Sequence, residues 1–256
     1  MGVGVGRVIG PALPPVEPRD ITWVSRPETL RRGIVKSVYD TGAPPPTFDV
    51  DLLETLNQEY AQRKLVADPP KYDPDSLEMA ARRRVQWVHG MVDVYGKRTL
   101  EIGCGSGFEV WSLAQHYDCE AYGVDVSEYG PWAALAGERV HFEMTDLGVH
   151  NPFPPNHFDR VISFTVWEHV LHPYALLEET YKALKPGGLA WIWVNRLSWR
   201  HYEDAMLRIG FKIRLVNFTK APMDREFYER FENVLGRFPE WDLQTDYFLV
   251  VLEKPA

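Results

Sequence analysis

Glycine occupies alternate positions in a short loop, as Gly103, Gly105 and Gly107, between an apolar segment and a helical one that begins at residue 108. Because glycine has no Cβ, such a loop turns tightly and lets a ligand approach the N-terminus of the following helix. Glu101, two residues before the first glycine, adds a carboxylate. The loop predicts a site for an adenosine-containing ligand, although structural turns use glycine for the same conformational reason.

The spacing of the glycines separates the classes of nucleotide site. A dinucleotide site needs a third glycine five residues after the first, where this chain has the bulky Phe108. The Gly-Lys-Ser/Thr ending of a nucleoside triphosphate loop is also absent from this segment. Dehydrogenase and ATPase activities are therefore disfavoured.

A carboxylate stands at the predicted end of the next strand, as Asp125. At the carboxyl end of a strand, its two oxygens can accept hydrogen bonds from both hydroxyls of a ribose. The alternative is that Asp125 caps the next helix near Ser127, since aspartate is favoured at helix caps. Its distance from the glycine loop favours the ribose.

A second group of reactive side chains follows the fourth predicted strand, as Glu168 and His169. An imidazole titrates near neutral pH, so His169 is the candidate general base and Glu168 its neighbour in the site. The alternative is that both residues only fix the loop by hydrogen bonds. A metal held by Glu168, His169 and His172 is less favoured, because adjacent residues rarely converge on one ion. We therefore expect no metal.

The elements that must position these residues alternate along the chain. An amphipathic helix is predicted from residue 75 or 76, with an apolar stripe that reaches Tyr95 and an end at Gly96. Short apolar strands then alternate with helical segments, which predicts an α/β fold with a seven-stranded, mostly parallel, doubly wound sheet and helices on both faces. The predicted strands cover residues 99–102, 121–124, 140–144, 160–164, 189–194, 211–216 and 247–252.

From about residue 75 to 216 the chain resembles the class I, Rossmann-like methyltransferases that use S-adenosylmethionine. The resemblance rests on motifs that occur in that family's order. They are residues 101–107, Asp125, residues 145–147 after the third strand, residues 158–163 and 167–170 around the fourth, and the Leu-Lys-Pro-Gly-Gly turn at 184–188 before the fifth.

The resemblance implies roles for individual residues. The loop from Gly103 to Gly107 would enclose the methionine part of S-adenosylmethionine, and Glu101 would anchor that loop or reach the amino group through water. Asp125 would hold the ribose, and Asp146 would bond the adenine amino group. The remaining implied contacts are Val126 and Leu147 on the two faces of the adenine, and the backbone of Ser163 or Phe164 at the methionine amine.

Three segments lie outside this pattern. Residues 1–48 are rich in proline and predict an N-terminal extension, and residues 49–95 predict a helical cover that helps define acceptor specificity. The predicted core, residues 96–256, holds an insert at 217–246, far longer than an ordinary hairpin loop. The aromatic stripe of the insert predicts a lid over the acceptor, or a surface that packs on the domain or on a second copy in a homodimer.

Composition limits the partners and the compartment. The formal net charge of −8 disfavours a nucleic acid partner, because phosphate binding needs a clustered basic surface. The run from Arg82 to Arg84 is the best basic patch, but such a run is more often a solvated helix face. The two cysteines, Cys104 and Cys119, predict reduced thiols in the cytoplasm, and we find neither a signal peptide nor a membrane-spanning run.

Together these features predict an enzyme that methylates a small-molecule acceptor, with a hydroxyl of a sugar, phenol or other natural product favoured over an amine. Two other functions remain open. One is a protein or RNA methyltransferase, which the acidic balance disfavours. The other is a non-catalytic subunit that binds S-adenosylmethionine and serves a partner enzyme, because a fold alone does not establish activity.

Overall fold

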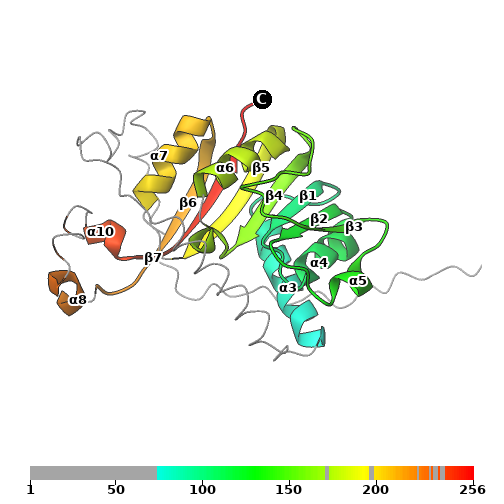
Figure 1. The fold of residues 1–256 in the computed structure, drawn as a ribbon, viewed down its shortest axis with the longest axis horizontal. Coiled ribbons are helices and arrows are strands. Elements are labelled where there is room, and N and C mark those ends of the chain that lie inside the picture. Colours follow the sequence, from blue (N-terminus) through cyan, green and yellow to red (C-terminus); the bar gives the residue numbers. More distant parts are fainter. Residues whose placement is uncertain are drawn as a thin grey trace, which may run out of the picture.

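The computed structural model describes residues 74–170, 173–195, 199–223, 225–230, 232, 236 and 240–256 (Figure 1). The predicted N-terminal extension at 1–48 and the part of the predicted helical cover from 49 to 73 lie outside this part of the chain. So do His172 and the side chains of the predicted aromatic stripe in the insert, which are those of Phe227, Phe231, Leu235 and Phe238. In the part that is described, no helix combines the length and the apolar character needed to span a membrane.

One seven-stranded sheet forms the centre of the domain, in the order β3-β2-β1-β4-β5-β7-β6. The first five strands pair in parallel, and β7 is antiparallel to both β5 and β6. The order reverses between β1 and β4, which is where open α/β sheets bind ligands at the carboxyl ends of their strands. The strands are β1 Arg98–Ile102, β2 Glu120–Asp125, β3 Val140–Met144, β4 Phe158–Phe164, β5 Leu184–Asn195, β6 Lys212–Lys220 and β7 Thr245–Glu253.

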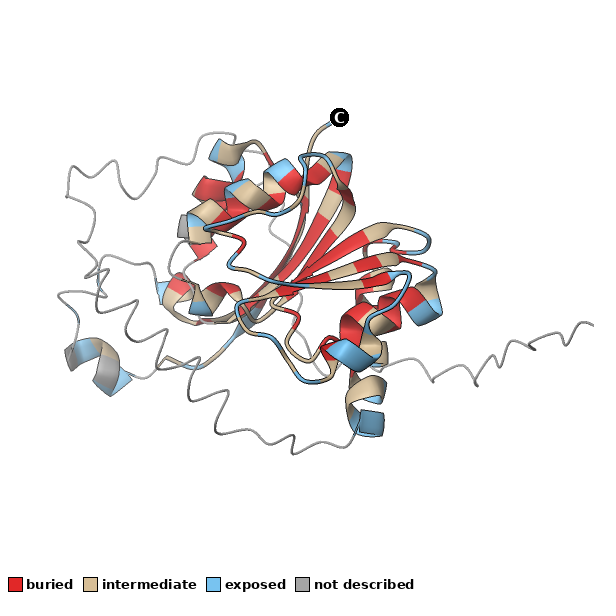
Figure 2. Ribbon diagram, turned by 45° about the vertical axis from the view of Figure 1, so that its right-hand side comes forward, coloured by how far each residue is buried: buried red, intermediate tan, exposed pale blue. Residues whose placement is uncertain are grey.

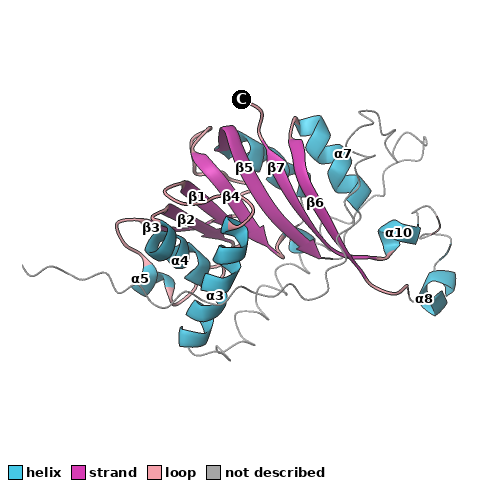
Figure 3. Cartoon of the chain, turned by 180° about the vertical axis from the view of Figure 1, so that it is seen from behind, coloured by secondary structure: helices cyan, strands magenta, loops and turns pink. Residues whose placement is uncertain are grey.

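Helices cover both faces of this sheet, as expected for a doubly wound fold (Figure 3). One face carries α3 Pro74–His89, α4 Phe108–Tyr117 and the short α5 Trp132–Leu135, and the other carries α6 Pro173–Ala183 and α7 Trp199–Ile209. Buried residues run along the central strands and occur on the helices that cover them (Figure 2). The predicted fold class is confirmed.

Two predicted boundaries are wrong. The helix predicted to reach Gly96 ends at His89, because the apolar stripe continues into a connecting loop whose Val92 and Val94 are core residues, while Tyr95 is exposed. The fifth strand begins at Leu184 rather than at residue 189. The glycines that predicted a turn there lie inside the strand, at a register shift between Leu184, which pairs with β4, and Leu189, which pairs with both β4 and β7.

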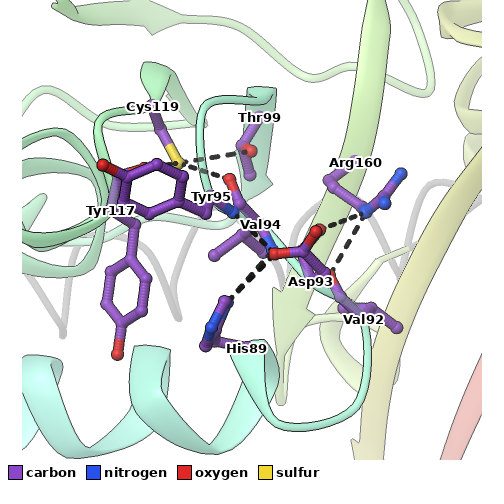
Figure 4. Close-up of polar contacts among 9 residues, drawn as sticks. All are labelled: His89, Val92, Asp93, Val94, Tyr95, Thr99, Tyr117, Cys119 and Arg160. Atoms are coloured by element: carbon purple, nitrogen blue, oxygen red, sulfur yellow. Dashed lines mark hydrogen bonds and ion pairs between the residues drawn. The ribbon is translucent and has the colours of Figure 1, made fainter.

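The loop between α3 and β1 is tied to the sheet by polar contacts (Figure 4). Arg160 of β4 donates hydrogen bonds through Nε to the carbonyl oxygens of Val92 and Asp93, at 3.2 and 2.9 Å. The thiol of Cys119 donates to the carbonyl oxygen of Val94 at 3.0 Å. Burial raises the pKa of this thiol to about 11. Both cysteines are free and buried, and the contacts fix α3 against β1 and β4.

Strands β6 and β7 extend into the predicted insert. Pairing between them begins at Lys220 and Thr245, so the residues that connect the two strands are 221–244 rather than 217–246. The connection contains the short helices α8 Arg225–Arg230 and α10 Glu240–Leu243. Within α10, the ring of Trp241 packs edge-on against Phe218, and Asp242 is only 4% exposed. The C-terminal part of the insert is therefore attached to the domain.

We expect Asp242→Ala to lower the free energy of unfolding by about 1–3 kcal/mol, because Oδ1 of Asp242 accepts a buried hydrogen bond from the backbone N–H of Trp199 at 3.0 Å. Urea denaturation followed by far-UV circular dichroism measures this cost. Glu226→Ala removes an exposed carboxylate of the same insert and serves as the control. Equal costs for the two variants would show that the buried hydrogen bond contributes nothing.

Candidate active site

The glycine loop leaves β1 at the point where the strand order reverses. The N–H groups of Gly103 and Cys104 both donate to the carbonyl oxygen of Val124 in β2, at 2.8 and 3.0 Å. The N–H of Gly107 donates to the carbonyl oxygen of Cys104 at 2.9 Å, and α4 begins at the next residue. The loop therefore leads directly into a helix N-terminus, where backbone N–H groups favour polar ligand groups.

The glycines of the loop serve different purposes. All three have positive φ angles, which side chains other than glycine rarely adopt. A Cβ at Gly103 would overlap the side chain of Val166, and one at Gly107 would approach the ring of Phe142 to 2.5 Å. A Cβ at Gly105 would meet no atom within 4 Å. Packing requires the outer two glycines, and the middle one borders open space.

Asp125 joins the end of β2 to this loop. Its Oδ2 accepts the N–H of Gly105 at 2.9 Å, and its Oδ1 accepts the N–H of Ser127 at 3.3 Å. The helix-cap alternative is thus present in part, because the carboxylate does organise the turn at Ser127. Each carboxylate oxygen can accept more than one hydrogen bond, so these contacts leave capacity for ligand hydroxyls.

Trp132 is a part of the site that the sequence analysis did not identify. Its indole N–H donates to the carbonyl oxygen of Gly105 at 2.7 Å, and its ring stacks on Phe142 with centroids 5.0 Å apart and planes 9° apart. Together with Asp125, it holds the middle glycine through both backbone polar groups. Nothing in the local pattern around Trp132 indicates this contact, because it joins segments 27 residues apart.

Glu101, at the end of β1, is buried in an acidic environment. The residue is 3% exposed, and its Oε2 has no hydrogen-bond partner within the described part of the chain. Burial and the neighbouring carboxylates Glu109 and Asp125 raise the pKa of Glu101, while the nearby cation of Arg84 opposes them. A buried carboxylate oxygen without a donor is costly, so it is a natural place for a donor from a ligand.

Arg84 is the cation of this cluster, and the sequence analysis misplaced it. The prediction for the basic run was a solvated face, with nucleic acid as the minor alternative. The structure instead pairs Arg84 with the buried Glu109 of α4 and places its guanidinium 6.0 Å from the centroid of the Phe164 ring. A signal was present, since Arg84 adjoins Val85 in the buried stripe of α3. One arginine of the run therefore belongs to the site.

The residues predicted to surround an adenine ring differ in how far they are buried. Val126 is 59% exposed at the end of β2, and Asp146 is exposed with Oδ1 accepting the N–H of Gly148 at 2.9 Å. The N–H of Thr145 donates to the carbonyl oxygen of Asp125 at 2.8 Å, which brings the two strand ends together. Leu147, by contrast, is 3% exposed and packs in the core, where its side chain offers little surface to a ligand.

The carboxyl end of β4 lies beside that of β1. Ser163 pairs with Ile102 in the sheet, and its hydroxyl donates to the carbonyl oxygen of Ile102 at 3.1 Å. Phe164 is partly buried, with its ring centroid 4.8 Å from that of Trp191. Thr165 then takes a positive φ of 51°, an uncommon conformation that turns the chain away from the strand. The two residues predicted to face the ligand through their backbone therefore border the glycine loop.

Glu168 and His169 lie in the turn that follows, the 3-10 helix η2 Trp167–His169. Trp167 anchors the turn in the core, and the N–H of His169 donates to the carbonyl oxygen of Val166 at 2.8 Å. The residue His169 is exposed, whereas both carboxylate oxygens of Glu168 are buried. Among the described residues, no three histidine, cysteine, aspartate or glutamate side chains group as metal ligands.

Comparison with known proteins places this geometry in a family context. Residues 100–192 match the family model described as "Methyltransferase domain". The chain is 27% identical over 138 residues to the ubiquinone biosynthesis O-methyltransferase of Azoarcus sp. (strain BH72), a match that covers 52% of this chain and 59% of that protein. The protein of the same name from Pseudomonas entomophila (strain L48) is 30% identical over 111 residues, covering 41% and 47%. The chain thus spans less than two thirds of these relatives.

Solved structures show the same fold. The 1,6-didemethyltoxoflavin-N1-methyltransferase of Burkholderia thailandensis superposes with a TM-score of 0.57 at 17% identity, covering 84% of this chain and 93% of that one. The [4+2]-cyclase SpnF superposes with a TM-score of 0.54 at 19% identity, covering 70% and 82%. Likeness at this level of identity concerns the fold alone.

The different surroundings of the glycines make a matched pair of variants informative. We expect Gly103→Ala to lower the free energy of unfolding by about 2–5 kcal/mol, from overpacking against Val166 and strain at positive φ. Gly105→Ala should cost only about 1–2 kcal/mol, because strain acts alone there. Guanidinium denaturation compares the two, and a cost at Gly105 as large as that at Gly103 would contradict the assigned packing.

Proposed function

Because the chain belongs to the class I, S-adenosylmethionine-dependent methyltransferases, we propose that it transfers the sulfonium methyl group to a hydroxyl of a small-molecule acceptor. The family match over residues 100–192 supports the reaction class. The curated relatives named O-methyltransferases favour oxygen over nitrogen as the methylated atom. A phenol, a sugar or another natural product remains the proposed acceptor class. A cytoplasmic location is part of the proposal, supported by the two free, buried cysteines.

The observation that carries the proposal is the open side of the glycine loop beside two carboxylates. Gly105 borders open space, Asp125 lies next to it with spare acceptor capacity, and Glu101 keeps a buried oxygen without a donor. These acceptors fit S-adenosylmethionine, whose ribose hydroxyls and ammonium group are hydrogen-bond donors and whose sulfonium and ammonium are cations. Bound there, S-adenosylmethionine supplies a methyl group that is already activated for transfer.

The proposed roles follow from this placement. Asp125 binds the ribose hydroxyls and also fixes the loop, and Glu101 binds the amine or anchors the loop. Val126 and Asp146, on neighbouring strand ends, border the adenine. The backbone at Ser163 and Phe164 faces the amino-acid part. Arg84 partly offsets the negative charge of the buried carboxylates Glu101 and Glu109 and so reduces the repulsion between them. The remaining negative charge favours a cationic ligand.

His169 is the proposed general base for the acceptor. It lies in η2, directly after the strand end that borders the glycine loop, and its residue is exposed. Removal of the hydroxyl proton there would increase the nucleophilicity of the acceptor oxygen, and proximity to the cofactor pocket would align that oxygen with the methyl group. In the alternative, His169 and Glu168 orient the acceptor without transferring a proton.

Calorimetric titration with S-adenosylmethionine and S-adenosylhomocysteine, with NAD as the control, tests the cofactor assignment. Binding of both sulfur compounds and not of NAD is expected. Folded protein that binds neither would refute the methyltransferase function. Because the same fold occurs in a cyclase, turnover with hydroxyl-bearing acceptors must then be measured by mass spectrometry of the methylated product.

We expect Asp125→Ala to weaken the affinity for S-adenosylmethionine by more than the ~1 kcal/mol of one ordinary hydrogen bond, because charge-assisted bonds are lost. The variant also loses the contact that holds Gly105. Calorimetry on the variant measures the change. Asp118→Ala, which removes an exposed carboxylate paired with Arg139, is the control. Unchanged affinity in Asp125→Ala would remove this residue from the cofactor site.

His169→Ala should lower kcat about a hundredfold or more if His169 is a general base, and should leave the Kd of S-adenosylmethionine nearly unchanged. Steady-state kinetics measures the first effect, and calorimetry measures the second. A fall in kcat of only a fewfold would indicate positioning alone.

A further inference from the structure

Three buried acceptor atoms without hydrogen-bond partners lie at the carboxyl edge of the sheet. They are Oε1 and Oε2 of Glu168 and Oδ1 of Asn195, each without a donor among the described residues. Glu168 follows β4 in η2, and Asn195 ends the neighbouring strand β5. Strand β5 contacts η2, so the two side chains belong to adjacent loops on the ligand edge.

The surroundings of Glu168 are aromatic rather than cationic. Burial, Tyr174 and Glu168 together raise the pKa of the Tyr202 hydroxyl, which places the carboxylate close to α6 and α7. The ring of Trp167 packs edge-on against Tyr202 at 6.5 Å, and its own indole N–H has no partner. No lysine or arginine in the described part of the chain forms an ion pair with Glu168. Within the described residues, the carboxylate is thus desolvated without a compensating charge.

Such an arrangement is unfavourable in the protein alone. A buried carboxylate that lacks donors carries a desolvation penalty which a fold ordinarily avoids by pairing or hydrogen bonding. Uncompensated polar groups of this kind cluster at functional sites, where a ligand supplies the missing partners. Here three of the four atoms without a partner are acceptors and lack a donor, whereas the indole N–H of Trp167 lacks an acceptor.

We propose that Glu168 and Asn195 form the polar end of the acceptor site and select acceptors that bring at least two hydroxyl or amine donors and no negative charge. The inference rests on the proposed methyl transfer. It adds to that proposal which charge the acceptor can carry and how many hydrogen-bond donors it must bring. An anionic acceptor is excluded by repulsion from Glu168, which the cluster of Glu101, Glu109 and Asp125 reinforces at longer range.

The first test is stability, which needs no known acceptor. In Glu168→Gln the charge is removed at nearly constant volume. We expect the Tm of the ligand-free protein to rise by about 2–4 °C, by relief of the desolvation penalty. Glu178→Gln, the same substitution at an exposed position of α6, is the control and should not change Tm. An unchanged or lower Tm in Glu168→Gln would overturn the proposal.

The second test uses three compounds with the same pair of ring hydroxyls and different charge. They are 4-methylcatechol, which is neutral, dopamine, which is cationic, and protocatechuate, which is anionic. With S-adenosylhomocysteine present, the neutral and cationic compounds should raise the Tm of the wild-type protein and bind at least tenfold more tightly than protocatechuate. In Glu168→Gln the preference should shrink severalfold, and Asn195→Leu should weaken the binding of all three.

The outcomes separate this inference from the proposed function. If Glu168→Gln still binds S-adenosylhomocysteine but protocatechuate binds wild-type protein as well as the neutral compound does, charge selection by Glu168 is wrong. If none of the three compounds stabilises the wild-type protein while the cofactor product binds, the assigned acceptor end is wrong. If the wild-type protein fails to bind S-adenosylhomocysteine, the proposed function itself fails, whatever the stability of Glu168→Gln.

Discussion

Two backbone hydrogen bonds to the carbonyl oxygen of Val124 fix the position of the glycine loop, and the rest of the site depends on them. They hold Gly103 and Cys104 against the end of β2, so that the carboxylate of Asp125, one residue further on, reaches the N–H of Gly105. The loop fits between β2 and the segment after β4 only because Gly103 lacks a Cβ that would overlap Val166. The packing of the loop backbone thereby determines where Asp125 and Gly105 can meet a ligand.

Charge is unevenly distributed around the glycine loop. The chain as a whole carries a net negative charge. Next to the glycine loop, the buried carboxylates of Glu101 and Glu109 face one arginine, Arg84, so this region is also negatively charged. A pocket of this composition suits a ligand that carries positive charge. The ion pair between Arg84 and Glu109 also ties α3 to α4 across this part of the domain. Electrostatics and helix packing are therefore coupled at the proposed cofactor site.

Some of the buried polar atoms without partners among the described residues lie on α3 and α4, and others lie at the ligand edge of the sheet. Those of Glu101, Glu168 and Asn195 lie at or near the carboxyl ends of β1, β4 and β5. At the opposite end of the sheet, the thiol of Cys119 and the guanidinium of Arg160 find backbone carbonyl partners. Satisfied contacts stabilise the base of the sheet, whereas the ligand edge keeps unused hydrogen-bonding capacity at a cost in stability.

The sequence alone determined the seven strands, the alternation with helices and the glycine loop, because these depend on local periodicity and on the conformations open to glycine. It misjudged the end of α3, since Val92 and Val94 continue an apolar stripe without continuing the helix. Only the tertiary structure assigned Arg84 and Trp132 to the site, buried Leu147 in the core and left Glu168 without a donor. Those properties depend on contacts between segments distant in sequence, and residue type and spacing do not encode such distances.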